Sequence, residues 1–255
     1  MRWLIPTCFL LIACSSDEFA SGGDAGADTS TATDGGSDTS TVDASPPDAA
    51  PADTGCATAT LDLPVEADTQ IISGSGSGLK YGQANAVAAR NDLGIIALFR
   101  FDVANLPKGA SLVAMSLDLP YVGKADNCVA NMACSICDGV EVSGSFNVHF
   151  MRSDWDEASV TFANKSTGVA WNPTASPASR SAPVAKFSHT AKTSEKVSIE
   201  PAHLVDVADW RQTDKLSVQI EGAAALGSFY MMTKENVCGG QPPNTKVLLH
   251  VTYCK

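Results

Sequence analysis

The sequence contains no apolar run of the roughly 20 residues that a membrane-spanning helix requires. Its longest apolar stretch lies within residues 1–13, follows the single basic residue Arg2, and is typical of a secretory signal. Residues 15–55 contain no lysine or arginine and almost nothing apolar larger than alanine. A segment of that composition cannot bury a core. We therefore predict an exported protein whose globular part begins at residue 56.

The end of the signal, Leu11-Ile12-Ala13-Cys14, resembles the cleavage site of a bacterial lipoprotein. Cleavage before Cys14 would leave this cysteine carrying the lipid, and three acyl chains anchor a protein stably because each buried methylene contributes about 0.8 kcal/mol. An ordinary signal followed by a chance cysteine is the alternative. Ser15 directly after Cys14 resembles outer-membrane sorting. We expect an exported, lipid-anchored protein at the outer membrane or cell surface that contacts the membrane only through its anchor.

The charge of the chain is concentrated in the segment that follows Cys14. Nine acidic residues lie between positions 15 and 55, among Ala, Ser, Thr, Gly and Pro. We predict that the lipidated Cys14 and a disordered acidic linker make up residues 14–55. The whole chain carries a net charge of −11, but residues 56–255 contribute only −3 of it. The low isoelectric point therefore describes the linker and does not exclude polyanionic partners of the domain.

Residues 56–255 show the pattern of strands almost throughout. In Lys215 to Ile220, Leu, Val and Ile alternate with Lys, Ser and Gln, which is the period of a half-buried strand. Similar runs occupy residues 112–119, 195–200, 228–232 and 246–253, with Gly, Pro and Asn between them. One short helix is expected over about residues 201–210, because Pro201 suits a first helical turn. These patterns predict an all-β antiparallel sandwich with one short helix.

An acidic turn, Asp154-Trp155-Asp156-Glu157, separates two strand-like segments, and other short fragments surround it in a recognisable order. Those fragments are Ala67-Asp68-Thr69, Lys80-Tyr81-Gly82, and residues 97–102, 105–110 and 248–253. Together they resemble a DNRLRE-type domain, a family related to carbohydrate-binding module family 96, over roughly residues 65–254. The resemblance implies a jelly-roll-like order of strands. Phe162 departs from the usual Trp, the letters DNRLRE do not occur, and residues 123–141 and 236–240 look inserted.

Six cysteines remain once the signal and Cys14 are set aside, and an even number in an exported domain predicts disulfides. Cys56 and Cys254 bracket the domain, and the first and last strands of a sandwich often lie side by side, so we predict a bond between them. The pairing of the other four stays open, and a zinc site is the alternative because Cys134 and Cys137 have ligand spacing. These four are Cys128, Cys134, Cys137 and Cys238.

No histidine lies in a metal-binding or catalytic-triad motif, and His149 and His250 fall on the polar phase of their strands, where we expect them to face solvent. The acids of the turn, Asp154, Asp156 and Glu157, could form a glycosidase pair only if two of them faced each other across a cleft. Calcium ligation is a second alternative. Solvated turn acids explain them more simply, so we expect no catalysis and no cofactor.

The resemblance directs the functional prediction towards binding, because relatives in family 96 bind polysaccharides, including the uronic-acid polymer alginate. The predicted site consists of Lys80, Tyr81, Arg90 and Arg100, since cations meet carboxylates and tyrosine stacks on sugar rings. For Arg100 the alternative is a structural ion pair with a carboxylate such as Asp102 or Asp118. We predict a noncatalytic polysaccharide-binding module without nucleic-acid partners. A disulfide-braced structural or adhesive surface module is the alternative, and the oligomeric state stays open.

Overall fold

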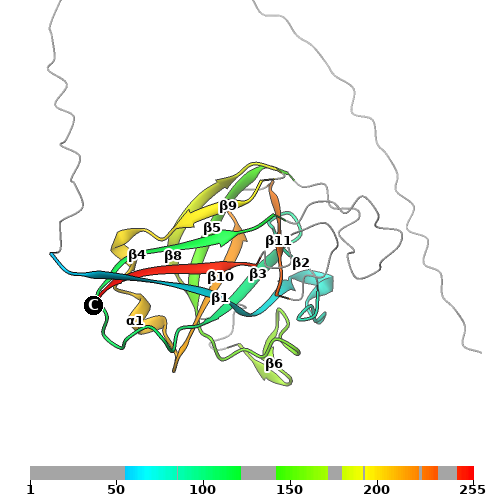
Figure 1. The fold of residues 1–255 in the computed structure, drawn as a ribbon. Helices are drawn as coiled ribbons and strands as arrows, with labels where there is room; N and C mark the ends of the chain where they lie inside the picture. Colours follow the sequence, from blue (N-terminus) through cyan, green and yellow to red (C-terminus); the bar gives the residue numbers. More distant parts are fainter. Residues whose placement is uncertain are drawn as a thin grey trace, which may run out of the picture. The chain divides into compact units, whose positions relative to one another are not determined.

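The computed structural model contains one large sheet of ten strands and a separate two-stranded sheet. Figure 1 shows the arrangement of the strands. The structure describes residues 55–84, 86–121, 142–171, 180–191, 193–223, 226–234 and 246–255. The predicted signal, Cys14, nearly all of the linker and the cysteines Cys128, Cys134, Cys137 and Cys238 lie outside these residues. Within the described ranges, no helix has the length and hydropathy needed to cross a membrane.

The elements are short apart from the first strand. The strands are β1 (Thr58–Ile72), β2 (Ala86–Arg90), β3 (Ile95–Asp102), β4 (Leu112–Leu119), β5 (Gly144–Met151), β6 (Asn164–Ser166), β7 (Val169–Ala170), β8 (Arg180–His189), β9 (Glu195–Ser198), β10 (Lys215–Gly222), β11 (Ser228–Met232) and β12 (Leu248–Cys254). The helical turns are η1 (Gly74–Gly76), η3 (Pro201–His203) and α1 (Val207–Trp210). The helix expected over residues 201–210 is therefore divided into a 3-10 turn and one turn of α-helix.

The strand order is that of a jelly roll. Hydrogen bonding gives β8-β5-β10-β3-β1-β12-β4-β9, and all the pairings are antiparallel. Strands β1, β4, β9 and β12 form one half, whereas β3, β5, β8 and β10 form the other. The long strand β1 joins the halves, because its first part pairs with β12 and its second part with β3. The predicted all-β antiparallel sandwich is confirmed.

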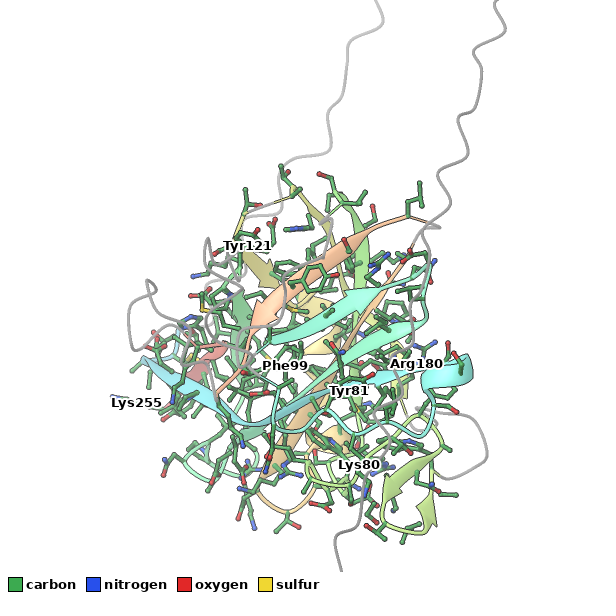
Figure 2. All side chains as sticks on the ribbon, turned by 90° about the vertical axis from the view of Figure 1, so that its right-hand side faces the viewer. Lys80, Tyr81, Phe99, Tyr121, Arg180 and Lys255 are labelled. Carbon is green, nitrogen blue, oxygen red and sulfur yellow. A yellow bond between two sulfur atoms is a disulfide. The ribbon has the colours of Figure 1, made fainter. Side chains whose placement is uncertain are left out.

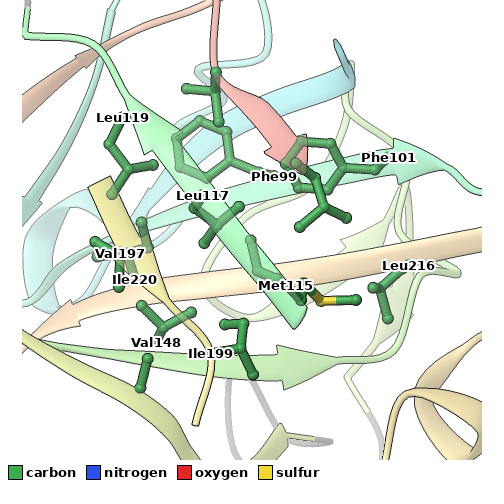
Figure 3. Close-up of a cluster of buried hydrophobic side chains, with 14 of the residues drawn as sticks. Phe99, Phe101, Met115, Leu117, Leu119, Val148, Val197, Ile199, Leu216 and Ile220 are labelled. Atoms are coloured by element: carbon green, nitrogen blue, oxygen red, sulfur yellow. The ribbon is translucent and has the colours of Figure 1, made fainter. Parts of the chain in front are cut away.

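The main core lies between the two halves of the sandwich. Alternate residues of β3 and β4 face it, including Phe99, Phe101, Met115 and Leu117. Figure 3 shows these side chains meeting others from β5, β9 and β10. The inward residues of each strand recur with period two, which is why the alternating sequence pattern correctly predicted β4, β9 and β10. Residues 52–255 form one compact unit, and the described core lies entirely within it.

A second core covers the outer face of β1, β3 and β5. Ile96 and Leu98, which alternate with the inward residues of β3, pack there with Trp155 and Trp171. Trp155, Val160, Phe162 and Trp171, all within residues 152–171, supply this cover. Both faces of β3 are therefore buried, and its sequence, Ile-Ile-Ala-Leu-Phe, is continuously apolar as expected of such a strand.

The two ends of the domain are joined covalently. Cys56 and Cys254 form a disulfide with a Cα–Cα distance of 5.6 Å. Antiparallel pairing places Thr58 opposite Cys254, and the Lys255 amide donates to the Ala57 carbonyl at 2.8 Å. Figure 1 shows β1 and β12 side by side. The predicted bond between Cys56 and Cys254 is confirmed.

Candidate functional site

Arg100 and Trp155, two residues that carry the resemblance, are in direct contact. The Arg100 guanidinium lies 4.8 Å from the centroid of the Trp155 ring, and its Nη1 donates to the Trp155 carbonyl at 2.6 Å. The Trp155 Nε1 donates in turn to Ser217 Oγ of β10 at 3.1 Å. The carboxylate nearest to Arg100 belongs to Glu66, 4.0 Å from Nε. Arg100 therefore holds the acidic turn against the sheet.

The structural alternative for Arg100, an ion pair with a carboxylate such as Asp102 or Asp118, is met by Glu66 and by neither of those two residues. Asp102 instead accepts from Lys215 Nζ at 3.1 Å, and Asp118 accepts from His250 Nε2 at 2.8 Å. Arg100 lies on β3, whose neighbours in the sheet are β1 and β10. The carboxylate within reach of Arg100 is that of Glu66 on β1.

Glu157 connects the same turn to Asp68 of β1 and to Lys234, which follows β11. One carboxylate oxygen accepts from the Asp68 amide at 2.8 Å, and the other accepts from Lys234 Nζ at 2.6 Å. The Lys234 amide donates to Asp68 Oδ2 at 2.8 Å, which closes the network. The Glu157–Lys234 pair was missed by sequence reasoning, because 77 positions separate its members and no motif marks either one.

Gly82 completes this arrangement from the opposite side of the turn. A Cβ atom at Gly82 would lie 2.0 Å from the Glu157 carbonyl oxygen, so no other residue fits there without displacing the turn. We call Asp68, Gly82, Arg100, Trp155 and Glu157 the Trp155 clamp. Fragments that are scattered along the sequence therefore meet at one place, and there they hold the structure together.

The three acids of the turn each have a partner. Asp154 pairs with Lys165, Asp156 accepts from the Ser159 hydroxyl, and Glu157 pairs with Lys234. The turn acids were expected to be solvated by water; Asp154 and Asp156 are exposed, as expected, while the half-buried Glu157 is held by Lys234. Across the described residues, no group of three or more His, Cys, Asp or Glu side chains is placed to hold a metal ion.

Of the predicted binding residues, Arg90 is engaged as firmly as Arg100. Its Nε and Nη2 donate to the two oxygens of Asp92 at 2.9 and 2.5 Å. The Asp92 hydrogen bond raises the pKa of Arg90, and Arg90 in turn lowers the pKa of Asp92. This bidentate pair fixes the turn between β2 and β3. Both cations are therefore engaged by the fold: the charge of Arg90 is offset by Asp92, whereas Arg100 donates to backbone carbonyls of the turn.

Lys80 and Tyr81 lie in a different setting, on residues 73–84, which we call the Lys80 loop (Figure 2). Lys80 is exposed and Tyr81 is half-buried, while the neighbouring Leu79 is 55% exposed. Burial raises the pKa of Tyr81, and the tyrosine hydroxyl is a hydrogen-bond donor at neutral pH. The loop thus presents an aliphatic, a cationic and an aromatic side chain in succession.

Backbone hydrogen bonds hold the Lys80 loop in one shape. The Ser73 amide donates to the Gly94 carbonyl at 3.1 Å, and the Phe162 amide donates to the Ser77 carbonyl at 3.2 Å. Within the loop, the Leu79 amide donates to Gly76 at 3.0 Å. Because Gly82 also abuts Glu157, the loop is anchored on both sides. Such pre-organisation lowers the entropy lost when a ligand binds.

The prediction that His149 faces solvent is wrong. His149 is only 3% exposed, its Nδ1 lies 3.0 Å from the Ser181 carbonyl, and its Nε2 lies 3.2 Å from Glu221. Burial raises the pKa of Glu221, but hydrogen bonds from His149 and Arg180 outweigh it, so this pKa lies below its ordinary value. The alternating pattern placed His149 correctly on the outer face of β5, but that face is covered.

His250 lies between two carboxylates on the outer face of the β1–β12–β4 half. Its Nδ1 is 2.7 Å from Asp62 and its Nε2 is 2.8 Å from Asp118. Burial lowers the pKa of His250, but the hydrogen bonds to Asp62 and Asp118 outweigh it and raise this pKa above 6.5. A histidine whose pKa is higher in the folded state than in the unfolded state stabilises the fold when it is protonated. This stabilisation is complete below the unfolded-state pKa and is lost as the pH rises through the folded-state pKa.

We therefore expect the stability advantage of the parent protein over His250→Gln to be largest below pH 6.5 and to shrink as the pH rises above it. Urea unfolding of both proteins at several pH values measures this difference, and an NMR titration of His250 locates the pKa directly. His203→Gln is a suitable control, because His203 has a single carboxylate neighbour, Asp206. A difference between parent and His250→Gln that is constant with pH would contradict the expectation.

Four of the fragments that resemble a DNRLRE-type domain, those that contain Asp68, Gly82, Arg100 and the acidic turn, thus meet in the Trp155 clamp. The family assignment itself stays a prediction that rests on those residues. No protein-family model matches this chain, and no curated protein matches it.

Proposed function

We propose that residues 56–255 form a noncatalytic, extracytoplasmic module that binds a polysaccharide and is held at the cell surface by a lipid on Cys14. The observation that carries this proposal is the Lys80 loop. It is fixed by backbone hydrogen bonds and presents Leu79, Lys80 and Tyr81 towards solvent to different degrees. A fixed loop with a cation beside an aromatic ring suits a charged sugar better than it suits a purely structural surface.

A uronic-acid polymer is the ligand class that this loop fits best. The Lys80 ammonium group can pair with a sugar carboxylate, and the Tyr81 ring and hydroxyl can contact the apolar face and a hydroxyl of a sugar. Arg90 and Arg100 are not included in the site, because both already donate to groups of the protein itself. The binding surface that we propose is therefore smaller than the one predicted from the sequence.

A structural or adhesive module without glycan specificity is the second candidate. The observations that favour it are the terminal disulfide and the Trp155 clamp, which both brace the sandwich without offering a ligand a surface. The two candidates differ in what they require of Lys80. A structural module does not need an exposed cation at that position, whereas a uronate-binding module does.

Retention of residues 52–255 on immobilised alginate, compared with the neutral glucan dextran, tests the proposal. We expect retention on alginate at low ionic strength and progressive loss of it with added salt, because exposed charges are screened over about 10 Å at 0.1 M. Dextran serves as the matched neutral polymer. If no polysaccharide retains the protein at low ionic strength, the structural candidate is preferred.

A further inference from the structure

A groove of about 430 Å³ lies between the β3–β4 connection and the helical segment that contains η3 and α1. It adjoins the disulfide-linked end of the domain, because the carbonyl of Ser111 in its lining accepts from the Cys254 amide at 2.8 Å. Figure 1 likewise places α1 near the C terminus. The volume falls within the range of roughly 300 to 1,000 Å³ that is usual for small-molecule sites. None of the residues in the predicted polysaccharide site lines this groove.

The groove has an aliphatic lining. Leu106, Leu204 and Val207 belong to the main core and also line the groove. Val205 also lines the groove and is 76% exposed, more than any other large hydrophobic side chain among the described residues. An exposed valine beside an apolar concavity is a feature that a bound apolar group would cover.

The polar side of the groove is cationic. Lys108 and Arg211 line it together with Ser111 and Thr213, and its lining contains neither Asp nor Glu. Arg211 is fixed, with its side chain 11% exposed, because Nη1 donates to the Leu106 carbonyl at 2.9 Å and Nη2 to Asp214 at 3.0 Å. Asp214 offsets part of the Arg211 charge. Lys108 is exposed, so its ammonium group can reach a ligand in the groove.

We propose that this groove binds a small amphipathic anion with an aliphatic body and a carboxylate head, that is, a fatty-acid-like ligand. The aliphatic lining would cover the chain, while Lys108 and the hydroxyls of Ser111 and Thr213 meet the carboxylate. A sugar fits this groove poorly, because no aromatic side chain lines it to stack on a ring. An aliphatic cation is disfavoured by Lys108 and Arg211. This site goes beyond the proposed polysaccharide binding and does not depend on it.

An NMR titration of residues 52–255 with octanoate, and separately with octylammonium, tests the proposal. Octanoate is expected to shift the amide signals of residues 106–112 and 201–211, whereas octylammonium binds at least about tenfold more weakly because the lining charges repel it. Lys108→Glu should weaken octanoate binding by about three- to tenfold. Val205→Asp should weaken it further, since it places a carboxylate beside the chain and the exposed position tolerates the change.

Lys80→Glu is the matched control, because Lys80 is also exposed but belongs to the Lys80 loop. It should leave octanoate binding unchanged while reducing alginate retention, so failure of either proposal can be recognised separately. The amide spectra also show whether each variant is folded. Equal affinities for octanoate and octylammonium, an unchanged affinity in Lys108→Glu, or signal changes confined to other residues would each overturn the assignment.

Discussion

Replacing both Cys56 and Cys254 by serine is expected to lower the free energy of unfolding by up to about 5 kcal/mol. The bond joins residues that are 198 positions apart, and closing so long a loop strongly restricts the unfolded chain. A loss of that size is comparable with the whole stability of many domains. The variant should therefore be only marginally folded at 25 °C.

Urea unfolding followed by tryptophan fluorescence measures this loss. The single variant Cys56→Ser is the appropriate control, because it breaks the same bond and should unfold at the same urea concentration as the double variant. Chemical reduction is a poorer experiment, since it also affects any bonds formed by the remaining cysteines. An unfolding midpoint of the double variant equal to that of the parent would show that the bond does not stabilise the domain.

Trp155→Ala is expected to cost about 3 to 5 kcal/mol, the usual range for removing a large buried aromatic side chain. Trp155 is 2% exposed, and it is packed in the second core between residues 152–171 and the sheet. The substitution also removes the donor to Ser217 and the ring beneath the Arg100 guanidinium. Residues 152–171 would then lose their main attachment to the outer face of β3.

Two further variants separate the contributions of Trp155. Trp155→Phe keeps an aromatic ring in the second core but leaves Ser217 without its donor, so we expect a smaller loss of about 1 to 3 kcal/mol. Trp210→Ala is the control for removing a tryptophan that is only half-buried. Urea unfolding of the three variants ranks them. If Trp155→Ala were no less stable than Trp210→Ala, the Trp155 clamp would not be a structural centre.

Strands β4, β9, β10, β11 and β12 could be predicted from sequence because apolar and polar residues alternate along them. In β10, Leu216, Val218 and Ile220 all face the main core, as their period-two spacing predicts. The bond between Cys56 and Cys254 followed from the neighbouring positions of the first and last strands. The jelly-roll order was implied only by the resemblance, because alternation along one strand contains no information about its neighbours.

The second core could not be predicted, because it depends on a segment folding back over the sheet. His149 shows a related limit, since the pattern gives its face of the strand but not its contacts with Ser181 and Glu221 of the neighbouring strands. Contacts in the Trp155 clamp join residues that are 55 and 89 positions apart. Such pairings are set by the tertiary fold, and neither spacing nor composition of a single sequence specifies them.

The same limit applies to the predicted polysaccharide site, because tertiary contacts decide which of its cations are free to bind a ligand. A sequence shows which residues carry charge but not whether another group of the protein already offsets it, as Asp92 does for Arg90. The groove beside α1 was missed entirely, because Lys108, Val205 and Arg211 come from separate segments and none belongs to a motif. Only their positions in the fold bring a cationic and an aliphatic surface together.

The affinity of residues 52–255 for alginate, measured for the parent protein, Lys80→Glu and Lys186→Glu, tests the central claim most directly. Lys186 is also exposed, but it lies on β8 and outside the Lys80 loop. We predict that Lys80→Glu weakens binding by about tenfold, or about 1.4 kcal/mol, and that Lys186→Glu changes it little. Equal effects of the two substitutions, or unchanged binding in Lys80→Glu, would contradict a polysaccharide site on the Lys80 loop.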